Sequence, residues 1–324
     1  MTRLLFEHHP RIGHRYVSEL RARVRHESGG YLVATNRDGF RTREFTARST
    51  PGRQRVLLFG DSFTAGDGVS NGRRFGDLLE RVLPDLEVLN FGLPATGTDQ
   101  QYLSYLEYAA GLGHDLVVIA VLVENIRRVM APYRGFVHRG TVVCYAKPYF
   151  TADDGRLTLH NVPVRRDPLD SDELQAAIDR SQLAEVTQGF GYGRPVPEYD
   201  DPEGPAWQLL RLILTSWIRD EQQRRPGHLS PVMVVPLPLF SHVEGDADPT
   251  SYQARFAELA ASTGCHLHDP LPDLLHYPQD ERRAFRFVKD IHPTPAGHHA
   301  LAASMAPALE RALASQRPSN EGRP

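Results

Sequence analysis

A serine close to the N-terminal end of this sequence lies in a setting that suits nucleophilic chemistry. Ser62 belongs to Gly60-Asp61-Ser62, which directly follows the apolar run Val56–Phe59. The run predicts a strand buried on both faces, and the glycine turn after it places the hydroxyl at the carboxyl end of that strand, where open parallel sheets bind ligands. The tripeptide is equally compatible with an ordinary strand-to-helix turn in which Ser62 or Thr64 caps the helix.

The C-terminal part of the sequence supplies the two residue types that a serine nucleophile needs. Asp290 and His292 lie two residues apart, just before a helical pattern through Leu301, Met305 and Leu309. A histidine can take the serine proton, and a carboxylate can hold that histidine in the correct tautomer. Taken together, these residues favour a catalytic interpretation of Ser62.

Two sequence blocks resemble those of a known enzyme family. GDSFT after an apolar strand, and D-x-H-P-x-x-x-G-H before the last helix, resemble the first and last blocks of the SGNH/GDSL hydrolases. The resemblance implies Ser62 as nucleophile, His292 as general base and Asp290 as the residue that orients the base. Many members carry the aspartate three residues before the histidine, where this sequence has Lys289.

The segment NFGLPATGTDQQ, residues 90–101, resembles the second block of the same family, in which a glycine N–H stabilises the oxyanion. Counted from Asn90 the glycine position falls at Ala95, whereas counted back from the end of the block it falls at Gly97. Both residues therefore remain candidates for the oxyanion donor. Asn90 and Asp99 also have an ordinary interpretation as turn and N-cap residues.

The third block lies where the apolar run from Asp115 ends. Here Glu124-Asn125 stands where the family has an asparagine between glycine and aspartate. Only an amide, and not an ionised carboxylate, can donate a hydrogen bond to an oxyanion, so we expect Asn125 to be the donor. Asp61, Glu124 and Arg127 are further candidates for substrate contacts, although Arg127 also fits a solvated helix face.

Strands and helices alternate through the rest of the chain, which predicts an α/β fold with right-handed crossovers. The resemblance implies a three-layer α/β/α, flavodoxin-like sandwich around a mainly parallel five-stranded sheet. The expected strands are Val56–Phe59, Glu87–Gly92, Asp115–Val123, Pro231–Leu239 and Cys265–Pro270, and the expected helices include Phe75–Val82, one from Tyr102, Trp207–Trp217 and Tyr252–Ser262.

Two regions lie outside this pattern. Residues 1–51 read as a segment that wraps around the hydrolase domain of residues 52–324, with a possible helix around Tyr16–His26 and a surface hairpin at Asn36–Arg41. Residues from about 133 to 205 read as an insertion at the substrate edge. In it we expect a hairpin between Val142–Phe150 and Leu157–His160, and a charged helix over Asp170–Val186.

Composition narrows the function classes. The 324-residue chain is 40% hydrophobic with a net charge of −3, which argues against nucleic acid or an anionic membrane as the main partner. Cys144 and Cys265 read as buried free thiols, and the absence of an apolar leader or membrane-spanning run predicts a cytoplasmic protein. His266, His268 and Asp269 invite a metal site, but their alternation along a short strand argues against one.

The sequence therefore predicts a serine esterase that needs neither cofactor nor metal. Its partner would be a small-molecule acyl ester of a sugar or hydroxylated metabolite, with a short acyl group because the insertion is polar rather than continuously apolar. The same serine could instead pass the acyl group to a hydroxyl, as in an acyltransferase. A catalytically silent binding module with this fold is the alternative from a different class. No feature of the sequence specifies an oligomeric state.

Overall fold

A five-stranded parallel sheet forms the centre of the molecule. The computed structural model describes residues 5–138, 141–173, 175, 196–225 and 231–315. The strand order is β13-β12-β7-β5-β6, and every neighbouring pair in it is parallel. This confirms the predicted α/β class and all five strands, which are β5 (Gln54–Phe59), β6 (Leu86–Asn90), β7 (Leu116–Leu122), β12 (Val232–Leu237) and β13 (His266–Leu267).

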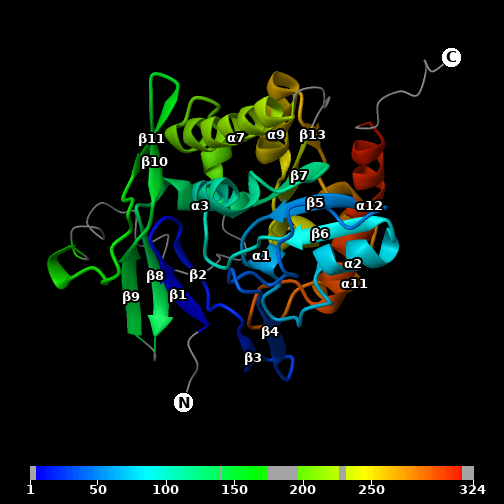
Figure 1. The fold of residues 1–324 in the computed structure, drawn as a ribbon. Coiled ribbons are helices and arrows are strands. Elements are labelled where there is room, and N and C mark those ends of the chain that lie inside the picture. The colour runs from blue at the N-terminus through cyan, green and yellow to red at the C-terminus, as the bar shows by residue number, and fades with distance from the viewer. Residues whose placement is uncertain (1–4, 139–140, 174, 176–195, 226–230, 316–324) are drawn as a thin grey trace.

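Helices cover both faces of the sheet (Figure 1), which gives the three layers. α2 (Phe75–Val82) packs against α12 (Pro295–Ser315) on one face, and α3 (Thr98–Ser104), α7 (Pro205–Arg224) and α9 (Thr250–Thr263) cover the other. All seven side chains of β7 are buried because both layers cover it. The shorter helices are α1 (Ser62–Ala65), η1 (Tyr105–Ala109), η2 (Val123–Asn125), α4 (Ile126–Met130), η3 (Pro197–Tyr199), α8 (Phe240–Glu244), α10 (Leu271–Leu275) and α11 (Gln279–Arg283).

The N-terminal segment is built from two β-hairpins, so the helix predicted around Tyr16–His26 is wrong. β1 (Phe6–His9) pairs with β2 (Gly13–Tyr16), and β3 (Arg21–Val24) pairs with β4 (Tyr31–Ala34). Exposed arginines alternate with half-buried apolar residues along β3. That period of two belongs to a strand and not to a helix.

The turn at Asn36–Arg41 exists, but it is not a surface hairpin. The Asn36 carboxamide accepts the N–H groups of Asp38 and Phe40 and so stabilises the turn. Phe40 and Arg41 are nevertheless fully buried. The reason is that the turn folds inward. The Phe40 ring packs against those of Phe91 and Tyr108, and the Arg41 guanidinium donates to the carbonyls of Ala65 and Gly66.

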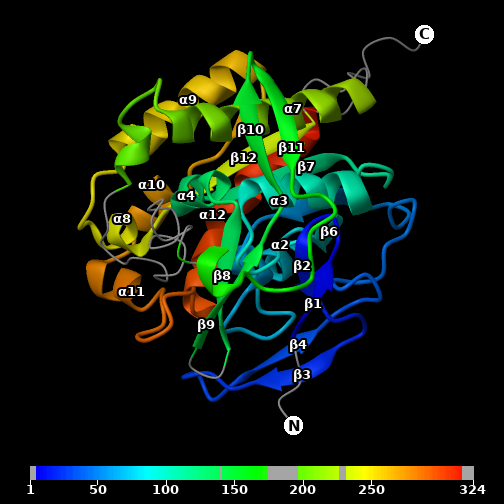
Figure 2. The same cartoon turned by 90° about the vertical axis from the view of Figure 1, so that its left-hand side faces the viewer.

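The segment from about 133 to 205, which the sequence predicts to be an insertion, contains two antiparallel ribbons in its described part. The predicted turn at Asp153–Arg156 is confirmed, and it joins β10 (Tyr149–Asp153) to β11 (Arg156–His160), which lie against α7 (Figure 2). The predicted strand Val142–Phe150 is in fact two strands, because Pro148 cannot donate to a sheet ladder. Its first part, β9 (Thr141–Ala146), pairs with β8 (Tyr133–His138). Most of the helix predicted over Asp170–Val186 lies outside the described residues.

Cys144 and Cys265 are buried free thiols, as predicted. Within the ranges given above, no helix is both long and apolar enough to span a membrane.

Candidate active site

Ser62 is the first residue of α1, immediately beyond the carboxyl end of β5. The turn requires glycine at position 60, because a Cβ there would lie 2.0 Å from Thr64 Oγ1. Ser62 is 3% exposed, and its Oγ has no hydrogen-bond partner in the described part of the chain. Other buried hydroxyls of the described chain, such as that of Thr64, share this state, so the position of Ser62 at the strand end is what distinguishes it.

The helix that carries Ser62 is short and is stabilised at both ends. Asp61 caps the N-terminus by accepting the Phe63 N–H at 3.0 Å, and Gly66 ends the helix in the left-handed region at φ +76°. The buried guanidinium of Arg41 donates to the Ala65 and Gly66 carbonyls at 2.8 Å each. Arg41 therefore satisfies the backbone groups that a one-turn helix leaves open.

The fold brings the C-terminal acid and base to this turn. His292 Nδ1 forms a short hydrogen bond with Asp290 Oδ1, and the His292 ring lies 5.5 Å from that of Phe63, the residue that follows Ser62. The loop that carries Asp290 and His292 therefore lies against the turn that carries Ser62.

The charges around His292 favour its protonated form. Burial acts to lower the pKa of His292, but the hydrogen bond with Asp290 and the nearby carboxylates of Asp67 and Asp61 outweigh it and raise the pKa above its ordinary value. Burial acts to raise the pKa of Asp290, and its bond to His292 and the neighbouring imidazoles reverse this, so that the pKa is lowered. Asp290 is therefore an anion that can stabilise an imidazolium at position 292.

Ala95 and Gly97, the two residues whose backbone N–H could bind the oxyanion, differ in conformation. Ala95 adopts φ +64°, a left-handed backbone that glycine tolerates best and that is uncommon for alanine. Gly97 has φ −92° and caps α3, and its N–H donates to Gln100 Oε1 at 3.3 Å. The Gly97 N–H therefore already donates a hydrogen bond at the start of α3.

Asn125 lies next to the serine turn. Its Nδ2 donates to Asp61 Oδ2 at 3.3 Å, whereas the Glu124 carboxylate lies 3.7 Å from the guanidinium of Arg127. Arg127 also forms an ion pair with Glu198 of the insertion, Nε to Oε1 at 2.5 Å. Asp61, one of the candidate substrate contacts, is fully buried, and its oxygens accept hydrogen bonds from protein groups.

Arg128 is a structural member of this site, a role that the sequence did not indicate. Its Nη1 donates to Asp61 Oδ2 at 3.0 Å and to the Thr96 carbonyl at 3.0 Å. Arg128 therefore connects α4, to which it belongs, with the serine turn at Asp61 and with the loop at Thr96. Nothing in the sequence distinguishes Arg128 from its neighbour Arg127, because the difference is only which side of α4 each lies on.

The region around this geometry matches one protein family. Residues 58–300 match the model of the GDSL-like lipase/acylhydrolase family. The chain belongs to that family.

Several solved structures are similar to this GDSL-like hydrolase. They include a lipase/acylhydrolase from Enterococcus faecalis (15% identity, TM-score 0.45, 82% of this chain and 99% of that chain covered) and an acetyl xylan esterase, AlAXEase (14%, 0.46, 79% and 99%). A third is the psychrotrophic esterase EstA from Pseudoalteromonas sp. (11%, 0.42, 81% and 99%). No curated protein sequence gives a match. Family membership makes the protein a serine-type ester hydrolase.

The insertion of this GDSL-like hydrolase is joined to the site by a buried ion pair. Lys147, between β9 and β10, forms a short contact with Asp99 in the first turn of α3. Burial raises the pKa of Asp99 and lowers that of Lys147, since each charge is removed from water. Asp99 is therefore a structural partner of the insertion, and Gly97 rather than Asp99 occupies the N-cap.

The loop that carries Asp290 and His292, called the acid loop below, has two partners that sequence reasoning missed. His26 Nε2 lies 3.0 Å from Asp290 Oδ2, and the Glu27 carboxylate accepts the Asp290 N–H at 2.7 Å. Both belong to the β3–β4 connection in the N-terminal segment, which lies beside the loop before α12 (Figure 1). Neither residue belongs to a recognisable motif, so no sequence signal could have found them.

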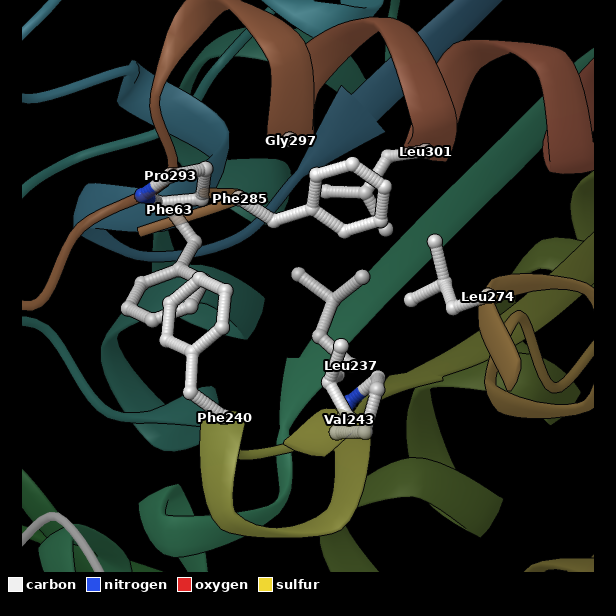
Figure 3. Close-up of a pocket in the computed structure, with 10 residues that line it drawn as sticks. Phe63, Leu237, Phe240, Val243, Leu274, Phe285, Pro293, Gly297 and Leu301 are labelled. Carbon is white, nitrogen blue, oxygen red and sulfur yellow. The ribbon is translucent and has the colours of Figure 1, made fainter. Parts of the chain in front are cut away.

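An apolar pocket of the hydrolase begins at Phe63 and Pro293, the residues that follow Ser62 and His292 (Figure 3). Its volume is small, about 20 Å³. Every side chain that lines it is apolar: Phe63, Leu237, Pro238, Phe240, Val243, Leu274, Phe285, Pro293 and Leu301, together with Gly297.

Among the residues that the structure describes, no group of three or more His, Cys, Asp or Glu side chains is arranged to bind a metal ion. Of the residues that invited this interpretation, His268 contacts Ser304 Oγ at 2.9 Å, and Asp269 accepts from Gln253 at 2.6 Å.

Proposed function

We propose that this GDSL-like hydrolase cleaves short acyl esters of a small hydroxylated compound through an acyl-enzyme on Ser62. The observation that carries the proposal is the hydrogen-bonded pair of His292 and Asp290 beside a serine hydroxyl that is buried and has no hydrogen-bond partner within the described ranges. Nucleophile, base and orienting acid are the three parts that acyl transfer by serine requires.

The reaction follows from these three roles. Ser62 Oγ attacks the ester carbonyl while His292 Nε2 takes its proton, and the proton then passes to the departing alcohol as the acyl-enzyme forms. Water repeats the sequence in the second half, which releases the carboxylic acid and regenerates Ser62. Asp290 keeps the proton on His292 Nδ1 throughout and stabilises the imidazolium, so Nε2 is the atom that exchanges protons.

Negative charge on the carbonyl oxygen would be stabilised by N–H donors of Ser62, Ala95 and Asn125. The left-handed backbone of Ala95 supports the choice of Ala95 over Gly97, whose N–H already donates to Gln100. An amide nitrogen carries two hydrogens, so Asn125 Nδ2 can donate to Asp61 and to the oxyanion at the same time. The bond to Asp61 would hold the amide in orientation before the charge develops.

The apolar pocket supports a short acyl group. The pocket volume of about 20 Å³ is only slightly larger than the smallest cavity that holds one water molecule, about 10–15 Å³. An acetyl methyl fits such a space, whereas a long chain would have to displace Leu274 or Leu301. No charged side chain lines the pocket, so it suits the acyl part of the substrate rather than the hydroxylated part.

Two measurements test the proposal. A serine-directed fluorophosphonate should add one adduct to the wild-type protein by intact mass and none to Ser62→Ala. Over nitrophenyl esters from acetyl to lauroyl, kcat/KM should fall with chain length. A protein labelled at another residue would remove Ser62 from the mechanism, and a steady rise toward lauroyl would contradict the short acyl group. Added sugar acceptors should leave the products unchanged if water is the acceptor.

A further inference from the structure

We propose that His26 is a positioning residue for the catalytic carboxylate, contributed by the N-terminal segment. The inference rests on the proposed roles of Asp290 and His292, and it adds a residue to them. The β3–β4 connection that carries His26 precedes residues 58–300, the part of the chain that the family model matches.

The Asp290 carboxylate bridges two histidines. Its Oδ1 binds His292 Nδ1, and its Oδ2 lies 3.0 Å from His26 Nε2. Each oxygen is thus assigned to one imidazole. A carboxylate held at both oxygens cannot rotate about its terminal torsion, which is otherwise broad.

The hydrogen-bond pattern fixes which tautomer of His26 is present. The Ser28 backbone N–H lies 3.2 Å from His26 Nδ1, and a backbone N–H can only donate. His26 Nδ1 therefore carries a lone pair, and the ring proton is on Nε2, where it is donated to Asp290. The Nε2–H is thus the group that His26 presents to the carboxylate.

Packing holds the His26 ring in place. Its side chain is 7% exposed and meets the Phe287 ring edge-on at 4.4 Å and the Tyr31 ring at 5.7 Å. On another side, a Cβ at Gly68 would lie 3.2 Å from the His26 ring and 2.5 Å from that of Phe287. The ring is therefore confined between the acid loop and the loop that follows α1.

The neighbouring Glu27 holds the backbone of the same loop. Its carboxylate accepts the N–H groups of Val288, Lys289 and Asp290 at 3.2, 2.9 and 2.7 Å. The side chain of Asp290 is itself 35% exposed, so water could compete for its oxygens if these contacts were absent. Glu27 fixes where the loop lies, and His26 fixes how the carboxylate is turned.

The test compares three substitutions at position 26 with one next to it. His26→Leu removes the donor while keeping an apolar side chain against Phe287, and we expect kcat to fall about 10- to 100-fold with KM nearly unchanged, the range typical of supporting hydrogen bonds. His26→Gln keeps a neutral N–H at similar reach and should recover most of that loss. His26→Asn is too short to reach Asp290 and should behave like His26→Leu. Arg25→Ala, exposed on the same hairpin, is the control and should match the wild type.

A double-variant cycle separates this inference from the proposed function. In an Asp290→Ala background, which removes both carboxylate oxygens, His26→Leu should cause little further loss of kcat, because its partner is absent. If Asp290→Ala alone kept full activity, the proposed role of Asp290 would fail. If Asp290→Ala were inactivating but His26→Leu kept wild-type kcat, or if the losses were additive, only the role of His26 would be overturned. Circular dichroism and thermal unfolding of each variant provide the folding control, and equal losses in the Leu and Gln variants would also contradict a hydrogen-bonding role.

Discussion

Asp61 and Arg128 form a buried ion pair beside the nucleophile, with Arg128 Nη1 3.0 Å from Asp61 Oδ2. The Asp61 side chain is fully buried and that of Arg128 is 7% exposed. Because Arg128 also donates to the Thr96 carbonyl, the pair ties the turn after β5 to the loop after β6 and to α4. The position of the serine turn relative to the proposed oxyanion donors therefore depends on two opposite charges that are almost completely buried.

Asp61→Asn should be strongly destabilising. The amide would leave the Arg128 charge without its buried counterion and turn an N–H group toward another donor, at a cost of about 3–5 kcal/mol. Urea unfolding of the variant against the wild type measures this cost. Glu44→Gln, in the exposed pair with Arg37, is the control and should change stability by less than about 1 kcal/mol. Equal effects at the two sites would contradict a structural role for the buried pair.

Arg41→Met should destabilise the helix that carries Ser62. The Arg41 guanidinium donates to four buried or half-buried carbonyls, those of Ala65, Gly66, Val69 and Leu32. Leaving such acceptors unsatisfied costs about 1–3 kcal/mol each, so a loss of at least about 3 kcal/mol is expected. Arg43→Met, two residues away in a partly exposed pair with Glu80, should cost less than about 1 kcal/mol. Thermal unfolding of both variants makes the comparison.

Activity should fall on the acid side at a pH above the ordinary range for histidine. His292 must be neutral to accept the serine proton. Because its pKa is raised, we expect the midpoint of acid inactivation to lie above the ordinary histidine pKa of about 6.5. The pH profile of kcat/KM measures this midpoint. Asp67→Asn removes one of the charges that raise the pKa, so the midpoint should move to lower pH. A midpoint that moved upward, or did not move, would contradict this account.

Asn125→Ala should lower kcat by about 100-fold or more with little change in KM, because the donated bond strengthens only as charge develops on the oxygen. Glu124→Ala is the matched comparison, since that side chain faces Arg127 and not Asp61. Steady-state kinetics on one nitrophenyl ester are sufficient. The assignment would have to be exchanged if Glu124→Ala lost the activity and Asn125→Ala kept it.

Leu274→Ala should shift acyl preference toward longer chains. Leu274 is buried at the wall of the apolar pocket, and its truncation enlarges a cavity of only about 20 Å³. We expect the ratio of butyryl to acetyl kcat/KM to rise about tenfold, in the range of 1–3 kcal/mol that methylene-sized pocket changes produce. Leu275→Ala, at an adjacent but exposed residue, should leave the ratio unchanged. An unchanged ratio in Leu274→Ala would show that the acyl group binds elsewhere.

Much of the central sheet could be predicted because its signals are local. Apolar runs of strand length, separated by helical periodicity, specify the five strands and their crossovers whatever the rest of the chain does. The insertion and the N-terminal segment were less predictable. The strand Val142–Phe150 is broken at a proline, and the alternation of β3 is only four residues long, so a helix over Tyr16–His26 was an equally good interpretation of the charges.

The sequence by itself determined which residues could do the chemistry: Ser62 at a strand end, and Asp290 with His292 before the last helix. Only the tertiary structure decided what holds them. Arg41, Arg128 and His26 read as solvated basic residues, and yet each is buried against groups far away in the chain: the end of α1, Asp61 and Asp290. Apolar side chains are buried because they leave water favourably whatever their neighbours are, and a sequence shows where such side chains occur. A polar side chain is buried only if folding brings it a partner, and the partner's position is a property of the whole fold.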